Sequence, residues 1–437
     1  MPTKPDVAAD QSAAPPADAL IEVADLKVHF ALRGGILGRL AGRSAGAVKA
    51  VDGVSFALGR GEVLGLVGES GSGKTTLSRA LLGLVPATSG TIRYDGRDIT
   101  NLSEHAMRPL RSKMQMVFQD PHAALNPSMD IATAVAHPLR IHGVAKDRAE
   151  IDRRVRAALD RVGLSPPDQY LTKYPGDLSG GQKQRAVLAR AIMLGPELLV
   201  ADEPVSMLDM SVRAKILDLM MELRRDLGLT YVYITHDLAT AKFFCDTIAI
   251  MYLGRIVEIG PAEQIYAAPQ HPYTKALLAA IPEPDPTRGV PRNLPRGEIP
   301  DAVTPPLGCS FHPRCPVAFD RCGWEGRDLR ILLEQHWLEL PVEQFTAERA
   351  VIGELEGLDR PATDVLLPAA TGHTGAEVAA LLQEVRDVHP DDPFWLGVAE
   401  TETLSGGLRV RFHGGTDPAL YVTPVEHVRA ACLLYGS

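Results

Sequence analysis

The segment GESGSGKT at residues 68–75 constrains the fold of this chain more than any other feature, because it fits the pattern G-x4-G-K-[ST]. The apolar run EVLGLVG at 62–68 precedes it and indicates a buried strand, and TTLSRALLGLV at 75–85 follows it and indicates a helix. In such a turn, backbone N–H groups surround phosphate oxygens, and the helix N-terminus adds a favourable dipole. The segment therefore predicts a phosphate-binding loop in an α/β fold.

The residues of this loop have different predicted roles. Lys74 is expected to reach the β and γ phosphates of a nucleotide, and Thr75 is expected to ligate Mg²⁺. The loop is glycine-rich because the backbone must curl closely around the phosphate oxygens. The remaining nucleotide-binding residues predicted in this segment are Gly68, Ser70, Gly71, Ser72, Gly73 and Thr76.

A second motif, LLVADE at 198–203, places two carboxylates at the end of an apolar strand. Asp202 is expected beside the phosphate loop, where it would hold Mg²⁺ directly or through water. Glu203 is then placed to polarise the attacking water. An apolar run that ends in Asp-Glu is common by itself, but it is specific when it follows a phosphate loop in the same α/β unit.

A third motif is LSGGQKQR at 178–185. Ser179 offers a hydroxyl to phosphate at the start of a helix, and Gly180 and Gly181 allow close approach of the backbone. Gln182 completes the predicted set of nucleotide-binding residues in this segment. On its chemistry alone the motif is ambiguous.

Further strands support the α/β assignment. Residues 20–30 alternate apolar and polar side chains, as an antiparallel strand does, and residues 48–58 indicate a second such strand. TYVYIT at 230–235 is another short apolar run. Strands that alternate with helices favour a parallel sheet.

Together the three motifs resemble those of the ATP-binding subunits of ABC transporters, whose signature is LSGGQ. The resemblance covers residues 20–325. It implies an ABC-type P-loop ATPase fold of class α/β: a RecA-like parallel core sheet, an antiparallel β subdomain and a helical subdomain. It also implies ATP and Mg²⁺ as ligands.

The resemblance assigns four further site residues. Phe30 corresponds to the aromatic residue that stacks on adenine, and Gln119, in VFQDP, to the Q-loop glutamine that contacts Mg²⁺. Asp209, in SMLD, corresponds to the D-loop, and His236, in THD, to the switch histidine that contacts the γ phosphate. In this family the signature loop of one subunit faces the phosphate loop of another, so two ATP molecules lie in a dimer interface. The catalytic set is therefore Lys74, Gln119, Glu203 and His236.

Four segments are similar to the peptide and nickel importer branch of this family: VFQDPHAALNP (117–127), DEPVSMLD (202–209), MYLGRIVE (251–258) and HPYTKALL (271–278). AMRPLRSKMQ at 106–115 resembles the F-type ATPase of oligopeptide and dipeptide importers. This implies a heterodimer with a D-type ATPase, two membrane permeases and, indirectly, an extracytoplasmic peptide-binding protein. It also implies a peripheral location at the cytoplasmic face of the cell membrane.

Three cysteines, Cys309, Cys315 and Cys322, lie in GCSFHPRCPVAFDRC with spacings of x5 and x6. EHVRAACLLY at 426–435 resembles the phrase that carries a fourth cysteine in relatives, which points to Cys432. Four thiolates could ligate a [4Fe–4S] cluster or zinc, and the lack of a C-x2-C pair favours the cluster. The alternative is that these are buried free thiols retained for packing.

The sequence divides into five predicted parts. They are a disordered tail (1–19), the ATPase cassette (20–281), a proline-rich linker with the cysteine segment (282–325), an acidic α+β insertion (326–425) and the end of the cysteine segment (426–437). The insertion holds 17 acidic residues, 7 Arg and no Lys, and its pattern predicts two or three helices followed by a hairpin around Gly406 and Gly407. It is expected to regulate the ATPase, contact a partner or stabilise the dimer, or to be only a solvated surface.

We expect an ATPase that energises import of di- or oligopeptides. One alternative is the same role for nickel or another small solute, and a second is a soluble ABC ATPase that acts on nucleic acid or the ribosome. Outside the insertion, the chain has 37 acidic and 38 basic residues, since the whole has 54 and 45. This balance gives no basic excess for nucleic-acid binding, and no run of apolar residues is long enough to span a membrane.

Overall fold

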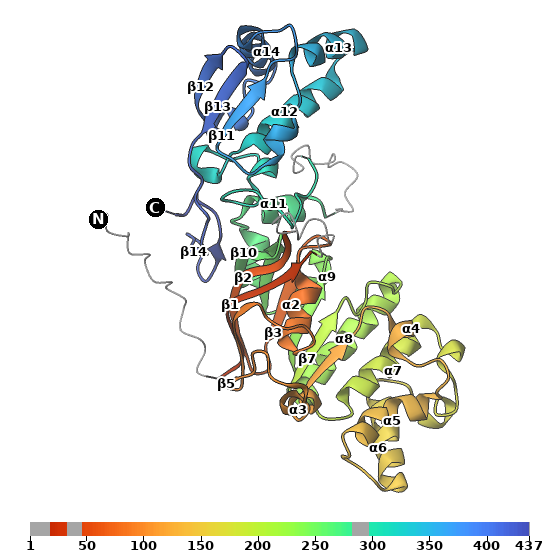
Figure 1. Cartoon of the computed structure of the whole chain (residues 1–437). Coiled ribbons are helices and arrows are strands. Elements are labelled where there is room, and N and C mark those ends of the chain that lie inside the picture. The colour runs from red at the N-terminus through yellow and green to blue at the C-terminus, as the bar shows by residue number, and fades with distance from the viewer. Residues whose placement is uncertain (1–17, 33–45, 282–296, 437) are drawn as a thin grey trace, which may run out of the picture.

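The computed structural model describes residues 18–32, 46–281 and 297–436. Three sheets organise them, as Figure 1 shows: two lie together in the middle of the molecule, and one lies in a module at the top of the view. A group of helices, α4 to α7, extends from the central part at the lower right. The mixed α/β class with a parallel core and an antiparallel subdomain, predicted from the sequence, is confirmed.

An eight-stranded sheet forms the core. Strands β9, β3, β8, β7 and β6 run parallel, and β10, β15 and β14 extend the sheet by antiparallel pairing. The residues of β3, β7 and β8 are all buried, as expected for parallel strands covered on both faces. The strands, in sheet order, are β14 (Tyr421–Val422), β15 (Arg429–Ala430), β10 (Arg255–Pro261), β9 (Thr247–Tyr252), β3 (Val63–Val67), β8 (Thr230–Thr235), β7 (Leu198–Asp202) and β6 (Met114–Val117).

The second sheet is antiparallel and four-stranded. Its order is β2 (Ala47–Gly59), β1 (Ala19–Ala31), β4 (Ser89–Tyr94) and β5 (Arg97–Asp98). Buried side chains of β1 pack with side chains of the core sheet into one apolar cluster, which explains their alternation in the sequence. The predicted tail lies mostly outside the described residues, and β1 begins one residue before the predicted start of the cassette.

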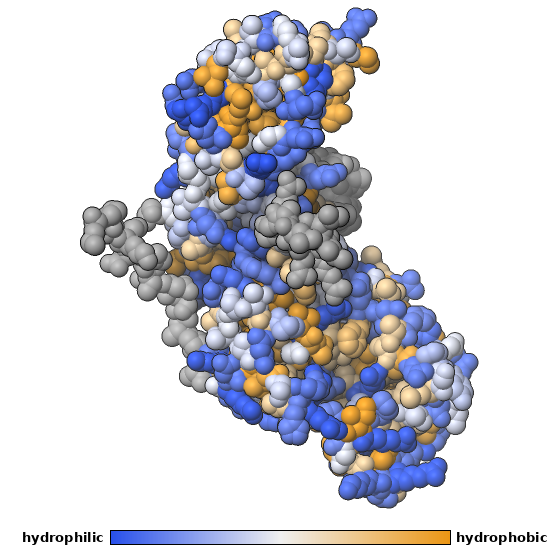
Figure 2. Space-filling view, in the orientation of Figure 1, coloured by the Kyte–Doolittle hydropathy of each residue, from blue (hydrophilic) through white to orange (hydrophobic). Residues whose placement is uncertain are grey.

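Helices surround these sheets. Helix α6 buries only Val155, Ala158 and Leu159, against α5 and α7, and its other residues are exposed or half-exposed. Accordingly, Figure 2 shows a mostly hydrophilic surface at this end of the molecule. The helices of the cassette are α2 (Lys74–Leu81), α3 (Glu104–Met107), α4 (Pro121–Ala124), α5 (Ile131–Ile141), α6 (Arg148–Arg161), α7 (Gly180–Ile192), α8 (Met210–Leu227), α9 (Leu238–Phe244), α10 (Ala262–Ala267) and α11 (Pro272–Ala279).

The acidic segment folds as a small α+β module with its own sheet, in the order β11 (Asp364–Pro368), β13 (Gly407–Phe412) and β12 (Val398–Leu404). Two or three helices were expected. The described module contains four α-helices: α12 (Gly326–Glu339), α13 (Val342–Val351), α14 (Gly375–Val388) and α15 (Phe394–Gly397). The extra helix, α15, has a single turn, which is too short for hydrophobic periodicity to reveal.

The chain enters and leaves this module at one place. The N–H of Thr416 donates to the carbonyl of Arg321 at 3.0 Å, and the backbones of Gly415 and Gly323 lie in contact. After this point the chain forms β14 and β15, and β15 pairs with β10 at the edge of the core sheet. The module therefore lies between two segments that pack with the cassette: the cysteine segment before it and the strands β14 and β15 after it.

The first half of the proline-rich linker predicted from the sequence, residues 282–296, lies outside the described residues. Within the part of the chain that the structure describes, no helix combines the length and apolar character that crossing a membrane requires.

Candidate nucleotide-binding site and cysteine pocket

The predicted phosphate loop lies between β3 and α2, at the carboxyl end of the parallel strands. Lys74 is the first residue of α2 and is buried. Its ammonium group donates to the carbonyls of Gly68 and Glu69, both at 2.8 Å, and to the hydroxyl of Ser72 at 3.2 Å. Burial lowers the pKa of Lys74, although nearby carboxylates oppose that shift. The lysine thus lies inside the curl of its own loop.

Two glycines of the loop are required by close backbone approach. A Cβ at Gly68 would lie 2.2 Å from the carbonyl oxygen of Met251. Gly73 has φ of 100° and caps α2, and a Cβ there would lie 2.0 Å from the carbonyl oxygen of Ala50. Only glycine fits both positions.

The predicted magnesium ligands are adjacent. The hydroxyl of Thr75 donates to Oδ1 of Asp202 at 3.4 Å, and Asp202 ends strand β7 with 6% of its surface exposed. Burial raises the pKa of Asp202, and the hydrogen bond from Thr75 opposes that rise. A hydroxyl beside a desolvated carboxylate is a donor set that suits Mg²⁺, because hard oxygen ligands and a compensating cation satisfy the buried charge.

Three predicted catalytic residues meet at Glu203. Its Oε2 accepts a hydrogen bond from Nε2 of Gln119 at 3.1 Å, and its Oε1 lies 3.0 Å from Nδ1 of His236. Glu203 follows β7 and has a positive φ of 47°, which is uncommon for a residue other than glycine. Strained backbone of this kind is concentrated at functional sites.

The signature segment begins helix α7. The hydroxyl of Ser179 accepts from the N–H of Gln182, and the side-chain oxygen of Gln182 accepts from the N–H of Ser179, which forms a capping box. A Cβ at Gly181 would lie 2.6 Å from the side chain of Val212. Ser179 and Gly180 are exposed to solvent.

The two remaining predicted residues also face solvent. Phe30 lies on β1 with 44% of its surface exposed, and Asp209 precedes α8 as an exposed residue. Within one chain the structure thus groups the loop, Asp202, Glu203, Gln119 and His236. Of the other predicted ligands in the loop, Ser70 and Gly71 are exposed, and Thr76 lies in the first turn of α2.

The structure reveals support for the phosphate loop that the sequence reasoning missed. Arg314, one residue before Cys315, pairs with the carboxylate of Glu69. The hydroxyl of Tyr273 accepts a hydrogen bond from the backbone N–H of Glu69 at 3.1 Å. In the sequence, Tyr273 belongs to the HPYTKALL segment. That segment resembles the importer branch, but the resemblance assigned no role to the tyrosine.

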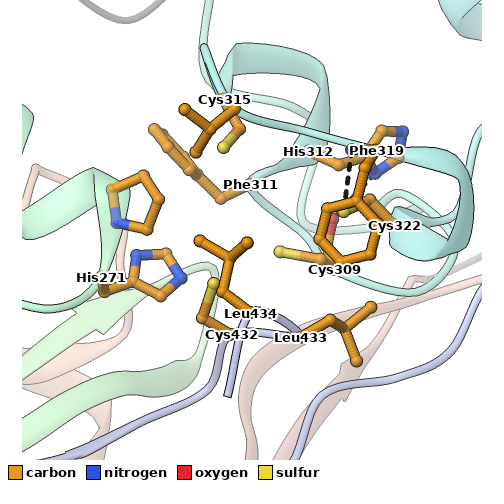
Figure 3. A pocket seen from close by; sticks show the side chains of 12 residues that line it. His271, Cys309, Phe311, His312, Cys315, Phe319, Cys322, Cys432, Leu433 and Leu434 are labelled. Carbon is orange, nitrogen blue, oxygen red and sulfur yellow. Dashed lines mark hydrogen bonds between the residues drawn. The ribbon is translucent and has the colours of Figure 1, made fainter. Parts of the chain in front are cut away.

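Figure 3 shows the four cysteines around a single pocket, although Cys432 is more than 100 residues from the others. Cys315, Cys322 and Cys432 are buried, and Cys309 is partly buried. Burial raises the pKa of Cys309, Cys322 and Cys432, because a thiolate loses its hydration there. The pocket is also lined by apolar side chains, among them Phe311, Leu433 and Leu434.

The four cysteines share one pocket, but the described residues are not arranged as a metal site. Among the described residues, no group of three or more His, Cys, Asp or Glu side chains is placed to hold a metal ion. The fifth cysteine, Cys245, is separate and buried at the end of α9.

Comparisons with known proteins identify the family. Residues 51–206 match the family model described as ABC transporter, and residues 257–322 match the one described as oligopeptide/dipeptide transporter, C-terminal region. The chain is 45% identical over 305 residues to the oligopeptide transport ATP-binding protein OppF of Salmonella typhimurium, covering 69% of this chain and 90% of that protein. It is 44% identical over 308 residues to the oligopeptide transport ATP-binding protein AppF of Bacillus subtilis, covering 70% and 92%.

Among solved structures, CbiO1 from Clostridium perfringens, part of the ABC transporter complex CbiONQ, matches with a TM-score of 0.50 and 28% identity. That match covers 57% of this chain and 92% of the other. The chain therefore belongs to the ATP-binding subunits of the oligopeptide and dipeptide ABC transporters.

Proposed function

We propose that this chain hydrolyses ATP to drive the import of di- or oligopeptides. The single observation that carries the proposal is the position of Glu203, which is held between Gln119 and His236 directly after the strand that ends in Asp202. The relatives OppF and AppF are oligopeptide transport ATP-binding proteins, which supports peptides as the class of cargo. Nickel or another small solute is the second candidate cargo, because the cassette would contact permeases and not the cargo.

The loop and its partners would bind the nucleotide. Lys74 would exchange its contacts with the carbonyls of Gly68 and Glu69 for the β and γ phosphates, which are better partners for a desolvated ammonium. Thr75 and Asp202 would hold Mg²⁺, which supplies neutralisation of phosphate charge. Phe30 would stack on the adenine ring with its exposed face.

Glu203 would act as the general base. Its carboxylate would accept the proton of the attacking water, and Gln119 and His236 would hold the carboxylate in place. His236 would then also contact the γ phosphate. Positioning and charge neutralisation carry most of the catalysis in phosphoryl transfer, so small displacements of these three side chains would be costly.

A dimer would complete the site. Ser179, Gly180 and Asp209 are exposed, which leaves them accessible to the nucleotide on a second ATPase subunit. We propose a heterodimer with a D-type ATPase, bound to two permeases at the cytoplasmic face of the cell membrane, with an extracytoplasmic peptide-binding protein beyond them. Closure of the dimer on ATP would move the permeases, and hydrolysis would reopen it.

Affinity purification from the native cell tests this proposal. The tagged chain, purified in mild detergent, is expected to carry two multi-pass permeases, a second ATPase and a peptide-binding protein, and peptides extracted from that protein would identify the cargo. A tagged Lys74→Ala variant is the matched control for ATP-dependent steps. Recovery of ribosomes or DNA-repair proteins without a permease would contradict the transport proposal and favour the soluble alternative.

The [4Fe–4S] cluster stays a separate proposal, with zinc the less favoured group. Its support is that Cys309, Cys315, Cys322 and Cys432 line one pocket. Protein purified without air is expected to contain iron and sulfide and to absorb near 400 nm, and a Cys315→Ser variant is expected to lose both. A Cys245→Ser variant is the control. Absence of both iron and zinc from the wild-type protein would contradict the proposal and leave four buried thiols.

A further inference from the structure

Glu69 is the second residue of the phosphate loop, so it adds a negative charge to a segment that is proposed to bind an anion. Its side chain is 29% exposed. It lies close enough to the ammonium of Lys74 for the two charges to interact, and its carbonyl accepts a hydrogen bond from that ammonium. An unpaired carboxylate at this position would repel the triphosphate that the loop is proposed to bind.

Arg314 neutralises this carboxylate from outside the cassette. Its Nη1 donates to Oε2 of Glu69 at 3.1 Å, and its Nη2 lies 3.4 Å from Oε1, so the two groups meet as parallel forks. Only 9% of the Arg314 side chain is exposed. Paired geometry of this kind fixes orientation as well as charge, which a lysine could not do.

Aromatic side chains hold the guanidinium in place. It lies over the rings of Tyr252 and Phe311, at 5.8 and 5.9 Å from their centroids, and its Nη1 also donates to the hydroxyl of Tyr252 at 3.4 Å. Phe311 packs in turn on Tyr252 and Tyr273, with centroids 5.4 and 5.3 Å apart. The arginine is therefore preorganised rather than a flexible surface residue.

The aromatic side chains around Arg314 also hold the backbone of Glu69. The hydroxyl of Tyr273 accepts from its N–H at 3.1 Å, while Arg314 holds its side chain. Tyr273 lies in the first turn of α11, and Phe311 and Arg314 lie in the cysteine segment. Both contacts therefore come from the part of the chain that follows β10. The phosphate loop is thus held on one side by its own lysine and on the other by this C-terminal region.

We propose that Arg314 is a positioning residue for ATP binding: it neutralises Glu69 and fixes the conformation of the phosphate loop before the nucleotide arrives. The inference rests on the proposed role of this loop in binding ATP. Because Arg314 would act through Glu69, we expect it to change the affinity for ATP and not the chemical step.

The test compares variants of the full chain by equilibrium titration with MgATP and, in the assembled transporter, by KM and kcat for ATP. Arg314→Gln is expected to weaken MgATP binding and raise KM about fivefold, because it leaves the Glu69 carboxylate unpaired, with little change in kcat. Arg314→Lys is expected to be intermediate. Glu69→Gln placed in the Arg314→Gln background is expected to restore affinity, since it removes the repulsive charge.

Salt and a neighbouring arginine provide controls. The defect of Arg314→Gln is expected to shrink between 0.05 and about 0.5 M salt, because screening weakens the repulsion between Glu69 and phosphate. Arg321→Gln, in the same segment but directed over the ring of Phe319, is expected to bind MgATP as the wild type does. Thermal unfolding of each variant separates loss of affinity from loss of folding.

Two results would overturn the inference: wild-type affinity in a folded Arg314→Gln protein, or a defect that Glu69→Gln fails to relieve. Lys74→Ala distinguishes this failure from failure of the proposed function. If Lys74→Ala still binds MgATP, the assignment of the nucleotide site itself is wrong. If Lys74→Ala abolishes binding and Arg314→Gln leaves it unchanged, only the role of Arg314 is wrong.

Discussion

At the scale of single residues, the site depends on groups whose neighbours are already in place. Glu203 is the clearest case, because Gln119 donates to one of its oxygens and His236 lies within hydrogen-bond distance of the other. Its backbone has a positive φ of 47°, a strained conformation of the kind found at functional sites. A conservative change of this carboxylate therefore separates binding from hydrolysis.

Glu203→Gln is expected to lower kcat by about 10²- to 10⁴-fold, because an amide cannot accept the proton of the attacking water. MgATP binding is expected to persist, since Lys74, Thr75 and Asp202 are untouched. Single-turnover hydrolysis and nucleotide titration measure the two effects. Glu222→Gln, an exposed position on α8, is the matched control. Hydrolysis by Glu203→Gln at the wild-type rate would remove Glu203 from the mechanism.

At the scale of secondary-structure elements, Glu197 joins three parts of the cassette. Its Oε1 lies 2.8 Å from Nζ of Lys113, just before β6, and its Oε2 accepts from Arg60 at 2.8 Å, in the turn between β2 and β3. The hydrogen bond from Lys113, together with that from Arg60, lowers the pKa of Glu197 to about 2. The carboxylate thus connects the antiparallel sheet with the edge of the parallel sheet.

Glu197→Gln is expected to lower the free energy of unfolding at pH 7 by about 1–2 kcal/mol, a value reduced for the partial exposure of the group. Because the folded-state pKa is depressed from its usual 4.5, this stability is present above about pH 4.5 and is lost as pH falls toward 2. Urea unfolding at pH 7, 5 and 3.5 should show the difference from wild type shrink. A difference that grows on acidification would contradict this assignment.

At the scale of the whole molecule, the two ends of the acidic module lie next to each other. Gly323 and Gly415 are in backbone contact, and the chain then adds β15 to the core sheet. The module buries apolar residues between its own sheet and helices. Its junction with the cysteine segment is partly apolar, since Trp324 packs on His312 and on Phe394 of the module. It is also partly polar, since Nε2 of His312 lies 3.0 Å from Oδ2 of Asp328 at the start of α12.

Removal of residues 324–415, with a two-glycine link in their place, is expected to leave MgATP affinity within about threefold of wild type. The reason is that none of the proposed nucleotide-binding residues lies in the module, and its ends are already adjacent. A modest fall in the unfolding temperature is expected, because His312 loses Asp328. Titration and thermal unfolding of the shortened chain measure both. Loss of MgATP binding in a folded protein would show that the module supports the site.

The sequence predicted local elements best. The strand before the phosphate loop, the helix after it and the acidic pair that ends β7 are each defined by a short pattern, because hydrophobic periodicity and glycine-rich turns act within a few residues. The short helix α15 and the pairing of β14 and β15 with the core sheet could not be read in this way. A two-residue strand carries no periodicity, and its partner β10 is more than 150 residues away.

By itself the sequence determined the family, the α/β core and the residues that line the phosphate loop, because each rests on a short motif whose chemistry requires fixed spacing. Only the tertiary structure decided what lies around them. The gathering of Cys432 with the other cysteines and the pairing of Arg314 with Glu69 join segments more than 100 residues apart. Such contacts depend on how β10, α11 and the inserted module pack on the core sheet, and no local pattern encodes that packing.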